Sequence, residues 1–452
     1  METTITDEHI KSFEEMPTLE VVPDDYVLNM PTYLAAQSQK LGPIFRRKLP
    51  QEQWAVFGKW IVYMIGPEAN KFVLNTHRDL FSHDKGWTPT LGGIFYKGLL
   101  NTDDPEHAKH RKMMNPAFAV VYMNRYLPIM RRVIEERTSD WAKQKEVDVY
   151  QECRKITFDV AAESLAGFKT GPEVDKLREL FYALMFADFN PKTETIEQFY
   201  QKYYAIRDNL NRMLLEMVNE RRKNPTDDIL GTLVTAQDED GETFTDEQIL
   251  GQLHILLVAG HETTTTMSAW LLYLLATNPD YLARVHAELD EILAETGGEI
   301  TLEATKSMKV LGNAVDEAGR LHSPAGNVPR GVVKDFEFGG YQVPEGTRVA
   351  LSLAACHRLP NIFANPDKFD PDRFAAPREE DRKNPYSLVT FGGGPRICIG
   401  MNFALVEMKA LAAHVLQKFS FAPASPDQEI MHVYYSPVAA ILGGIPLKVT
   451  AR

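Results

Sequence analysis

The sequence predicts a mainly α-helical protein with a small β region, built as one domain over residues 1–452. Helical patterns of apolar residues recur along most of the chain, whereas segments with strand patterns are few and short. Hydrophobic residues make up 44% of the sequence and charged residues 25%, which is the balance of a soluble chain that buries a core. No Gly/Ser-rich or Pro-rich linker divides the chain, which favours one large domain.

The longest helix is predicted at about residues 246–277. Thr245 and Gln248 form a capping box at its start, and Pro279 stops the apolar pattern at its end. At 1.5 Å per residue this helix is about 48 Å long, enough to cross the whole domain. It is apolar nearly all round except at its centre, residues 261–266, where a polar patch costs stability unless it has partners.

The other predicted elements are shorter. Residues 54–57 and 60–65 flank Gly58-Lys59 and predict a β-hairpin. Further helices are predicted to begin at Asp104-Pro105, at Asn278-Pro279 and after Gly400, and one more covers about residues 308–322. Short strands at 332–338, 341–343 and 348–351 are separated by glycine and proline turns and predict one small sheet.

Composition excludes several classes of protein. The 49 Lys and Arg are outnumbered by 62 Asp and Glu, and the net charge of −13 argues against a nucleic-acid binder. Three cysteines exclude a disulfide scaffold and indicate a reducing compartment. The first twenty residues hold no apolar signal-peptide core, and no run of about 18 apolar residues predicts a membrane anchor. We therefore expect a cytoplasmic protein.

The most informative segment is the glycine-rich stretch at residues 391–400, which contains Cys398. Its glycines allow the backbone to approach a flat group closely, and a thiol near a helix start, with Arg396 two residues away, favours the thiolate. A glycine-rich turn with a buried structural cysteine is the alternative. A phosphate loop would end in Gly-Lys-Ser/Thr, and a zinc site would need paired cysteines, both of which are missing.

Residues 391–400 resemble, position for position, the haem-thiolate signature FxGxxRxCxG of the cytochrome P450 family. The resemblance implies a cytochrome P450 fold with haem b as cofactor and O2 as co-substrate. It also implies Cys398 as the iron ligand, Arg396 at a haem propionate, and Phe391 and Gly400 as part of the haem-binding loop. In this family the thiolate favours cleavage of the O–O bond.

Residues 259–264 are similar to the motif on the distal helix of the same family. The resemblance implies that Ala259 and Gly260 shape a groove for oxygen, and that Glu262 and Thr263 are catalytic residues that manage protons. An alternative for Thr263 is a hydroxyl that bonds back to the carbonyl of Ala259 one turn earlier, and the two roles are compatible.

Two further motifs match the family in the expected order. Glu317 and Arg320 form an ExxR pair on one helix face, and Arg373 is the expected third member of a structural triad that supports the haem loop. A surface ion pair is the alternative. His107 and Arg111 match the HxxxR pattern that binds haem propionates, although a solvated basic face is the alternative. A further propionate ligand is expected at Arg330.

The implied function is a haem-thiolate monooxygenase that inserts one oxygen atom of O2 into a lipophilic small molecule by hydroxylation or epoxidation. The alternative enzyme uses or rearranges peroxides; a haem sensor and a haem-free helical scaffold with a buried cysteine are further alternatives. Substrate-pocket candidates, placed by position, are Trp87, Phe95, Phe186, Ala325 and Val328.

Electrons are expected from a separate ferredoxin or flavodoxin with its reductase. Lys109 and Lys112 form a local basic run in an acidic chain, which Arg131 and Arg132 extend. We expect an acidic electron donor to dock there, steered by charge. A solvated helix face is the alternative.

Overall fold

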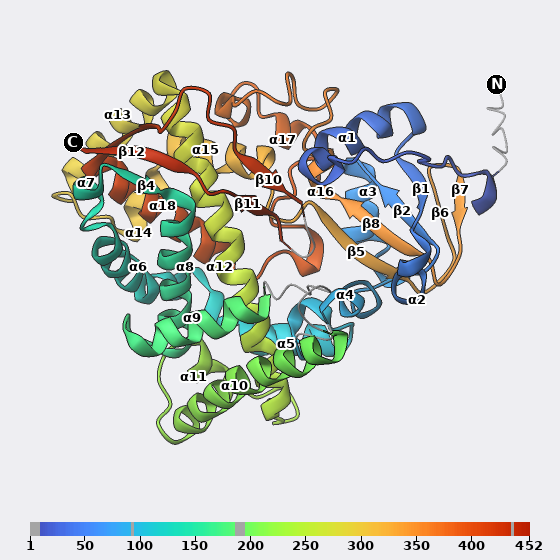
Figure 1. Cartoon of the computed structure of the whole chain (residues 1–452), viewed down its shortest axis with the longest axis horizontal. Coiled ribbons are helices and arrows are strands. Elements are labelled where there is room, and N and C mark those ends of the chain that lie inside the picture. Colours follow the sequence, from blue (N-terminus) through green and yellow to red (C-terminus); the bar gives the residue numbers. More distant parts are fainter. Residues whose placement is uncertain (1–9, 92–94, 186–194, 435–437) are drawn as a thin grey trace. The chain divides into compact units, whose positions relative to one another are not determined.

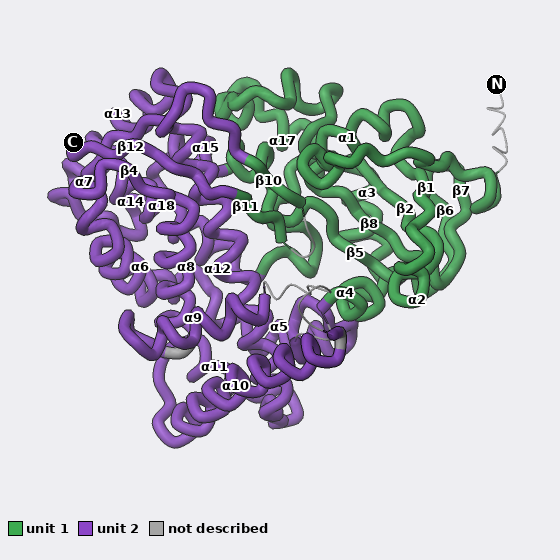
Figure 2. Tube along the Cα trace, in the orientation of Figure 1, with its two compact units in different colours: residues 1–90, 316–398, 431–442 green, residues 91–315, 399–430, 443–452 purple. Residues whose placement is uncertain are grey.

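The structure is a computed structural model that describes residues 10–91, 95–185, 195–434 and 438–452. It separates into two compact units, each assembled from three stretches of the chain (Figures 1 and 2). Unit 1 comprises residues 1–90, 316–398 and 431–442, and unit 2 comprises residues 91–315, 399–430 and 443–452. The prediction of a single domain is not tested by this division and stays a prediction.

Unit 1 is built around a five-stranded sheet with the strand order β1-β2-β8-β5-β3. Strands β2 and β8 are parallel, and the other neighbours are antiparallel. The five strands are β1 (Ile44–Lys48), β2 (Trp60–Met64), β3 (Phe81–Ser82), β5 (Asn327–Val332) and β8 (Arg348–Ser352). Two small hairpins complete the β structure: β6 (Phe336–Phe338) with β7 (Tyr341–Val343), and β10 (Met431–Val433) with β11 (Ala440–Leu442).

Short helices surround this sheet. They are α1 (Tyr26–Leu41), α2 (Trp54–Phe57), α3 (Pro67–Lys71), α16 (Leu353–Cys356) and α17 (Glu380–Lys383), while α4 (Asp84–Leu91) and α15 (Lys309–Leu321) each have one end in unit 1. Single helical turns lie at η1 (Phe13–Glu15), η2 (Gln51–Gln53), η3 (Phe72–Thr76), η4 (Arg78–Leu80), η8 (Pro371–Phe374) and η9 (Gly394–Arg396). Two apolar clusters pack on the sheet, one including Ile44, Val62 and Leu351 and the other Phe45, Tyr63 and Ala350.

The predicted hairpin around Gly58 is wrong in its first half. Trp54–Phe57 is helix α2, and strand β2 pairs instead with β1, which the sequence analysis missed. Gly58 takes φ +79° and ends the helix, and Trp54 donates an indole hydrogen bond to the carbonyl of Leu49 at 2.7 Å. The predicted strand 332–338 is also divided between β5 and β6, so the three predicted strands belong to two sheets.

Unit 2 is mainly helical. Its helices are α5 (Glu106–Met114), α6 (Met123–Thr138), α7 (Trp141–Gln144), α8 (Val149–Ala166), α9 (Pro172–Met185), α10 (Ile196–Lys223), α11 (Ile229–Thr235), α12 (Asp246–Thr277), α13 (Pro279–Glu295), α14 (Leu302–Ser307) and α18 (Met401–Lys418). Single turns lie at η5 (Leu99–Asn101), η6 (Asn115–Phe118) and η7 (Val120–Tyr122). An antiparallel sheet joins β4 (Glu146–Asp148), β12 (Pro446–Ala451) and β9 (Phe419–Pro423).

Helix α12 organises unit 2, and it begins and ends where the sequence predicts. The reciprocal Thr245–Gln248 capping box is present, and the next helix starts at Pro279. Helix α12 packs chiefly along α8 and also against α18 and α10 (Figure 1). None of the described helices combines the length and hydrophobicity that a bilayer crossing requires.

Candidate functional site

The loop that carries Cys398 lies in unit 1 and is shaped by two glycines. Gly392 and Gly394 have φ values of +75° and +66°, and a Cβ on Gly394 would lie 2.2 Å from the carbonyl oxygen of Leu74. The amide of Cys398 donates to the carbonyl of Phe391 at 2.9 Å and closes the loop. Only glycine meets both demands at position 394, because the left-handed conformation and the close backbone contact each exclude a side chain.

Cys398 is the accessible thiol of this protein. All three cysteines lie in the described residues and none forms a disulfide; Cys398 is exposed, whereas Cys153 and Cys356 are buried. Burial raises the pKa of the Cys356 thiol to about 12 and also raises the pKa of Cys153. A ligand or metal ion can therefore reach one sulfur, and it is the one in the glycine-rich loop. This excludes the predicted alternative of a buried structural cysteine.

Two arginines predicted at haem propionates also lie in unit 1. Arg396 ends the turn η9 in the cysteine loop and is half-buried. Arg330 lies on strand β5 with 5% of its surface exposed, and its Nη1 donates to the carbonyl of Pro329 at 2.8 Å. Buried guanidinium groups suit carboxylate ligands because their planar forks pair with both oxygens.

The structure brings Glu317, Arg320 and Arg373 together in a fully buried cluster. Arg320 donates to both carboxylate oxygens of Glu317, at 2.7 and 2.8 Å, and Arg373 Nε lies 3.1 Å from each oxygen. All three side chains are 0% exposed. The predicted surface ion pair is therefore excluded, and the cluster has the charge balance and hydrogen bonds that a buried carboxylate requires.

Hydrogen bonds connect this cluster to the cysteine loop. Arg320 Nη1 donates to the carbonyl of His357 at 2.8 Å, and the ring Nε2 of His357 accepts from the amide of Val389 at 3.0 Å. Val389 in turn accepts from the amide of Gly392 at 2.8 Å. Burial lowers the pKa of His357 to about 3, so the neutral ring keeps a lone pair for Val389. Sequence reasoning attached no function to His357.

At the centre of α12, in unit 2, one stripe of the helix is uncovered. The helix is buried along most of its length, but Ala259 is exposed, and Leu256, Gly260 and Thr263 are partly exposed. The spacing of these four residues places them on one face. A Cβ added to Gly260 would meet nothing within 4 Å. The stripe therefore offers a small-residue surface on which a flat ligand fits.

Thr263 makes the backward hydrogen bond considered from the sequence. Its hydroxyl donates to the carbonyl of Ala259 at 2.6 Å, and Thr264 does the same to Gly260 at 3.1 Å. Two consecutive hydroxyls thus bind carbonyls one turn back, on the edge of the uncovered stripe. The Thr263 side chain is held in one orientation while its oxygen keeps a free lone pair for a second partner.

Glu262 points to the opposite side of α12 and forms a buried ion pair. Its carboxylate lies 2.8 Å from Arg154 on α8 and 3.1 Å from His261 Nε2. Burial alone would raise the pKa of Glu262, but His261 and Arg154 outweigh it and lower the pKa to about 2. The carboxylate is therefore ionised at neutral pH. Sequence reasoning missed Arg154, which lies 108 residues away in the chain.

His107 and Arg111 lie one turn apart on α5 in unit 2. His107 is 4% exposed, and its Nδ1 lies 3.3 Å from the carboxylate of Asp104. Arg111 is half-buried. The buried position of His107 argues against the alternative of a wholly solvated basic face.

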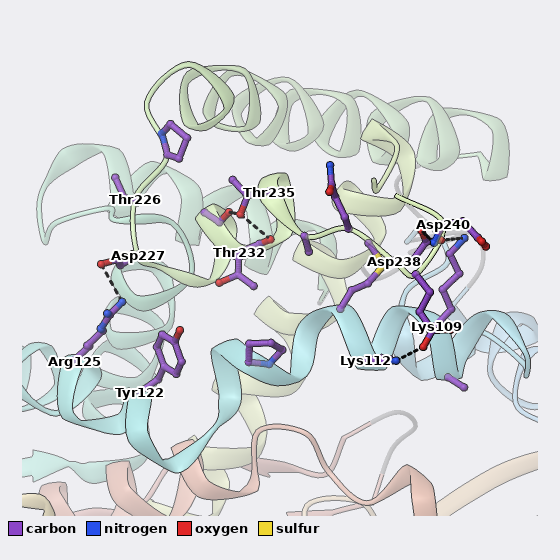
Figure 3. A pocket seen from close by; sticks show the side chains of 18 residues that line it. Lys109, Lys112, Tyr122, Arg125, Thr226, Asp227, Thr232, Thr235, Asp238 and Asp240 are labelled. Carbon is purple, nitrogen blue, oxygen red and sulfur yellow. Dashed lines mark hydrogen bonds and ion pairs between the residues drawn. The ribbon is translucent and has the colours of Figure 1, made fainter. Parts of the chain in front are cut away.

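The basic run on α5 is neutralised within unit 2. Lys109 pairs with Asp238 and lies 2.8 Å from Glu242, and Lys112 pairs with Glu239 (Figure 3). The hydrogen bond from Lys109 lowers the pKa of Asp238. The acidic loop that precedes α12 thus supplies counter-charges to this run, and docking of an electron donor there stays a prediction. The local sequence could not reveal a partner about 130 residues away.

A cavity of about 850 Å³ lies between α5 and residues 225–240 of unit 2 (Figure 3). Its charged walls also pair with each other, as Arg125 with Asp227 at 3.0 Å. The two remaining predicted cations are paired as well: Arg131 with Glu299, and Arg132 with Glu136 and Glu163.

The predicted substrate-pocket residues are distributed over both units. Trp87, Ala325 and Val328 belong to unit 1, where Trp87 is 4% exposed and the other two are half-buried. Phe95 belongs to unit 2 and is also 4% exposed. Phe186 lies outside the described residues.

Comparison with known proteins agrees with these features. The profile of the family described as Cytochrome P450 matches residues 27–440. A putative cytochrome P450 136 of Mycobacterium tuberculosis is 30% identical over 86% of this chain and 80% of its own length. A sterol 14alpha-demethylase of Mycolicibacterium vanbaalenii is 30% identical over 82% of this chain and 83% of its own length. A solved cyanobacterial cytochrome P450 with bound retinoic acid has a TM-score of 0.81 and 27% identity, covering 96% of this chain and 99% of that one. The chain therefore belongs to the cytochrome P450 family and is an oxidoreductase of the monooxygenase class.

Proposed function

We propose that this enzyme hydroxylates or epoxidises a lipophilic terpenoid or sterol-like molecule, with haem b held by Cys398 and electrons supplied by a separate ferredoxin or flavodoxin and its reductase. The observation that carries the proposal is the single accessible thiol, Cys398, in a glycine-rich loop closed by backbone hydrogen bonds. A cytoplasmic location stays a prediction from the cysteine content.

The residues present fit haem. Cys398 offers an accessible sulfur, and the uncovered stripe at Ala259 and Gly260 offers a surface without side chains. Arg330 and Arg396 of unit 1, and His107 and Arg111 of unit 2, are the proposed propionate ligands, while Phe391 and Gly400 belong to the loop around the sulfur. Haem with a thiolate ligand supplies O2 activation and insertion of one oxygen atom into the substrate.

The chain's own residues hold and move protons. We propose that Thr263 is the first residue of the proton path, because its hydroxyl is held by the carbonyl of Ala259 and lies on the uncovered stripe. Glu262 is ionised and paired with Arg154, so it can accept a proton only after its carboxylate turns away from that arginine. Proton supply through Glu262 is therefore proposed to require a side-chain rotation.

The substrate class is inferred from two relatives. One is named a sterol 14alpha-demethylase, and one solved neighbour contains retinoic acid. Both names denote isoprenoid molecules with a large apolar body. The half-buried Ala325 and Val328 and the buried Phe95 provide apolar surface for such a ligand.

The reduced carbon-monoxide difference spectrum tests the haem assignment. Wild-type protein from haem-replete cells should give the strongly red-shifted band of a thiolate-bound haem, and Cys398→His should lose or shift it. Cys356→Ser is the matched control, because it removes a thiol that is buried and lies outside the cysteine loop. Retention of the band in Cys398→His would refute the assignment.

The oxidant that supports turnover distinguishes the proposed function from the peroxide-using alternative. Product should form with NADPH, ferredoxin, reductase and O2. Thr263→Val should lower the amount of product formed per NADPH consumed. Product formation with hydrogen peroxide alone, at the same rate and without any effect of Thr263→Val, would favour the alternative.

The paired lysines suggest how the electron donor is recognised. Because Lys109 and Lys112 are neutralised, we propose that an acidic donor gains little from α5 in the wild type. Replacing Asp238 by Asn and Glu239 and Glu242 by Gln should speed reduction by an acidic ferredoxin at low salt and make it more sensitive to salt. An unchanged rate and salt dependence would place the docking surface elsewhere.

A further inference from the structure

His254 of α12 is a buried histidine with two unpaired ring nitrogens. Its side chain is 0% exposed, and neither Nδ1 nor Nε2 has a hydrogen-bond partner within the described part of the chain. His261, seven residues later on the same helix, is also 0% exposed. There the ring is fully partnered: Nδ1 lies 3.2 Å from the Leu257 carbonyl, and Nε2 lies 3.0 Å from the Tyr182 hydroxyl.

The surroundings of His254 are aromatic and belong to unit 2. Tyr96 stacks on the imidazole with ring centroids 6.0 Å apart and an angle of 7°, and Phe95 lies 5.4 Å away. Phe95 is buried, whereas Tyr96 is half-exposed. Of these two rings, Tyr96 is therefore the one that solvent reaches.

The segment that carries these aromatic rings is fixed against α12. A Cβ on Gly251 would lie 2.0 Å from the carbonyl oxygen of Lys97, so the two backbones are in direct contact. The amide of Leu99 donates to Gln252 Oε1 at 2.9 Å. Gln252 and the nearby Asn101 each have a buried amide donor without a described partner, Gln252 Nε2 and Asn101 Nδ2. Buried polar atoms without a described partner thus occur both on α12 and on the segment that packs against it.

Such an arrangement is unfavourable unless a ligand uses it. A buried polar group without a partner costs its full desolvation energy, whereas an apolar residue of the same shape costs nothing. Burial lowers the pKa of His254 to about 4, so the ring is neutral near pH 7 and offers one donor and one acceptor.

We propose that His254 is a specificity-determining residue that binds the hydroxyl group of an otherwise apolar substrate. A hydroxyl both donates and accepts a hydrogen bond, as the neutral imidazole does. The inference rests on the proposed function, since it concerns the substrate of the same enzyme.

The first arm of the test measures thermal unfolding of substrate-free protein. His254→Phe keeps the stacking ring and removes both unpaired nitrogens, so its midpoint should equal or exceed that of the wild type. His261→Phe is the matched control and should lower the midpoint, because it removes the hydrogen bonds of the imidazole to Tyr182 and Leu257 and its contact with the Glu262 carboxylate. An equal loss in both variants would overturn the inference, since it would mean that His254 is already partnered, for example by an ordered water molecule.

The second arm measures binding by equilibrium dialysis, which needs no signal from haem. The probes are androst-5-en-3β-ol and its hydrocarbon, androst-5-ene. Wild type should bind the alcohol roughly tenfold more tightly or better, and His254→Phe should bring that ratio close to one without weakening the hydrocarbon. An unchanged ratio in the variant, no preference in the wild type, or no binding of either probe would overturn the inference.

The two proposals fail separately. A missing thiolate band in the carbon-monoxide spectrum would refute the haem assignment even if His254→Phe abolished the preference for the alcohol. A normal band with an unchanged alcohol preference would refute only the role of His254.

Discussion

The buried ion pair between Arg154 and Glu262 predicts a large and measurable coupling energy. Arg154→Met removes the charge and keeps an unbranched apolar side chain of similar reach. The side chains of Arg154 and Glu262 are 16% and 4% exposed, with 2.8 Å between nitrogen and oxygen. Removing one partner of a buried pair costs about 3–5 kcal/mol, because the remaining charge is left uncompensated.

His261 reduces that cost. It stays 3.1 Å from the carboxylate in the variant and keeps part of the stabilisation, so we expect a loss of about 2–3 kcal/mol for Arg154→Met. Glu262→Gln also removes the carboxylate that faces the guanidinium and should cost a similar amount. The double variant removes both charges, so its loss should fall short of the sum by about 2 kcal/mol.

Urea unfolding followed by far-ultraviolet circular dichroism gives the four free energies of this cycle. The coupling energy has a defined pH dependence. The pKa of Glu262 is lowered from its ordinary value of 4.5 to about 2, so the pair contributes fully above pH 4.5 and is lost as the pH falls toward 2. Losses that add to within about 0.5 kcal/mol at pH 7 would refute the reasoning, because additivity is the behaviour of independent sites.

Three further predictions concern other parts of the chain. Gly394→Ala should destabilise the cysteine loop by about 1–3 kcal/mol, measured as loss of the carbon-monoxide band on warming, because its φ is +66° and its Cβ would lie 2.2 Å from Leu74. Glu317→Gln should cost about 3–5 kcal/mol in urea unfolding, because it leaves the buried guanidinium of Arg320 without its carboxylate and leaves Arg373 with Glu380 alone. Burial lowers the pKa of His254 from 6.5 to about 4, with a smaller contribution from Arg207, so the folded state binds fewer protons than the unfolded state in that range. Wild type should therefore lose roughly 3 kcal/mol more than His254→Phe between pH 6.5 and 4, and equal pH profiles would contradict the assignment.

Local signals in the sequence were sufficient for the long helix and the cysteine loop. The capping box at Thr245 and the proline at position 279 set the two ends of α12, because both act within one turn of the chain. The loop before Cys398 needs glycine at particular positions, so its residue types are visible in the sequence. The buried cluster of Glu317 and Arg373 also required no more than the order of two motifs.

The error at Trp54–Phe57 has a physical reason. Four apolar residues before a glycine fit a short helix as well as a strand, because so short a run shows no period. The structure favours the helix, since Gly58 ends it with a positive φ and Trp54 bonds back to Leu49. The correct partner of strand β2 is β1, whose sequence Ile-Phe-Arg-Arg-Lys carries no clear alternation of apolar and polar residues.

Motifs predict which groups react, but the electrostatic state of these groups depends on residues outside the motifs. Glu262 has the position of a proton carrier, yet Arg154 and His261 hold it ionised. Lys109 lies in a basic run, yet Asp238 neutralises it. Arg154 and Asp238 each lie more than 100 residues from the residue they pair with, where no local pattern could indicate them, whereas His261 adjoins Glu262 in the sequence. If Glu262 carries protons as proposed, its ion pair with Arg154 must be broken first, and the rate of that step should respond to Arg154 as strongly as to Glu262.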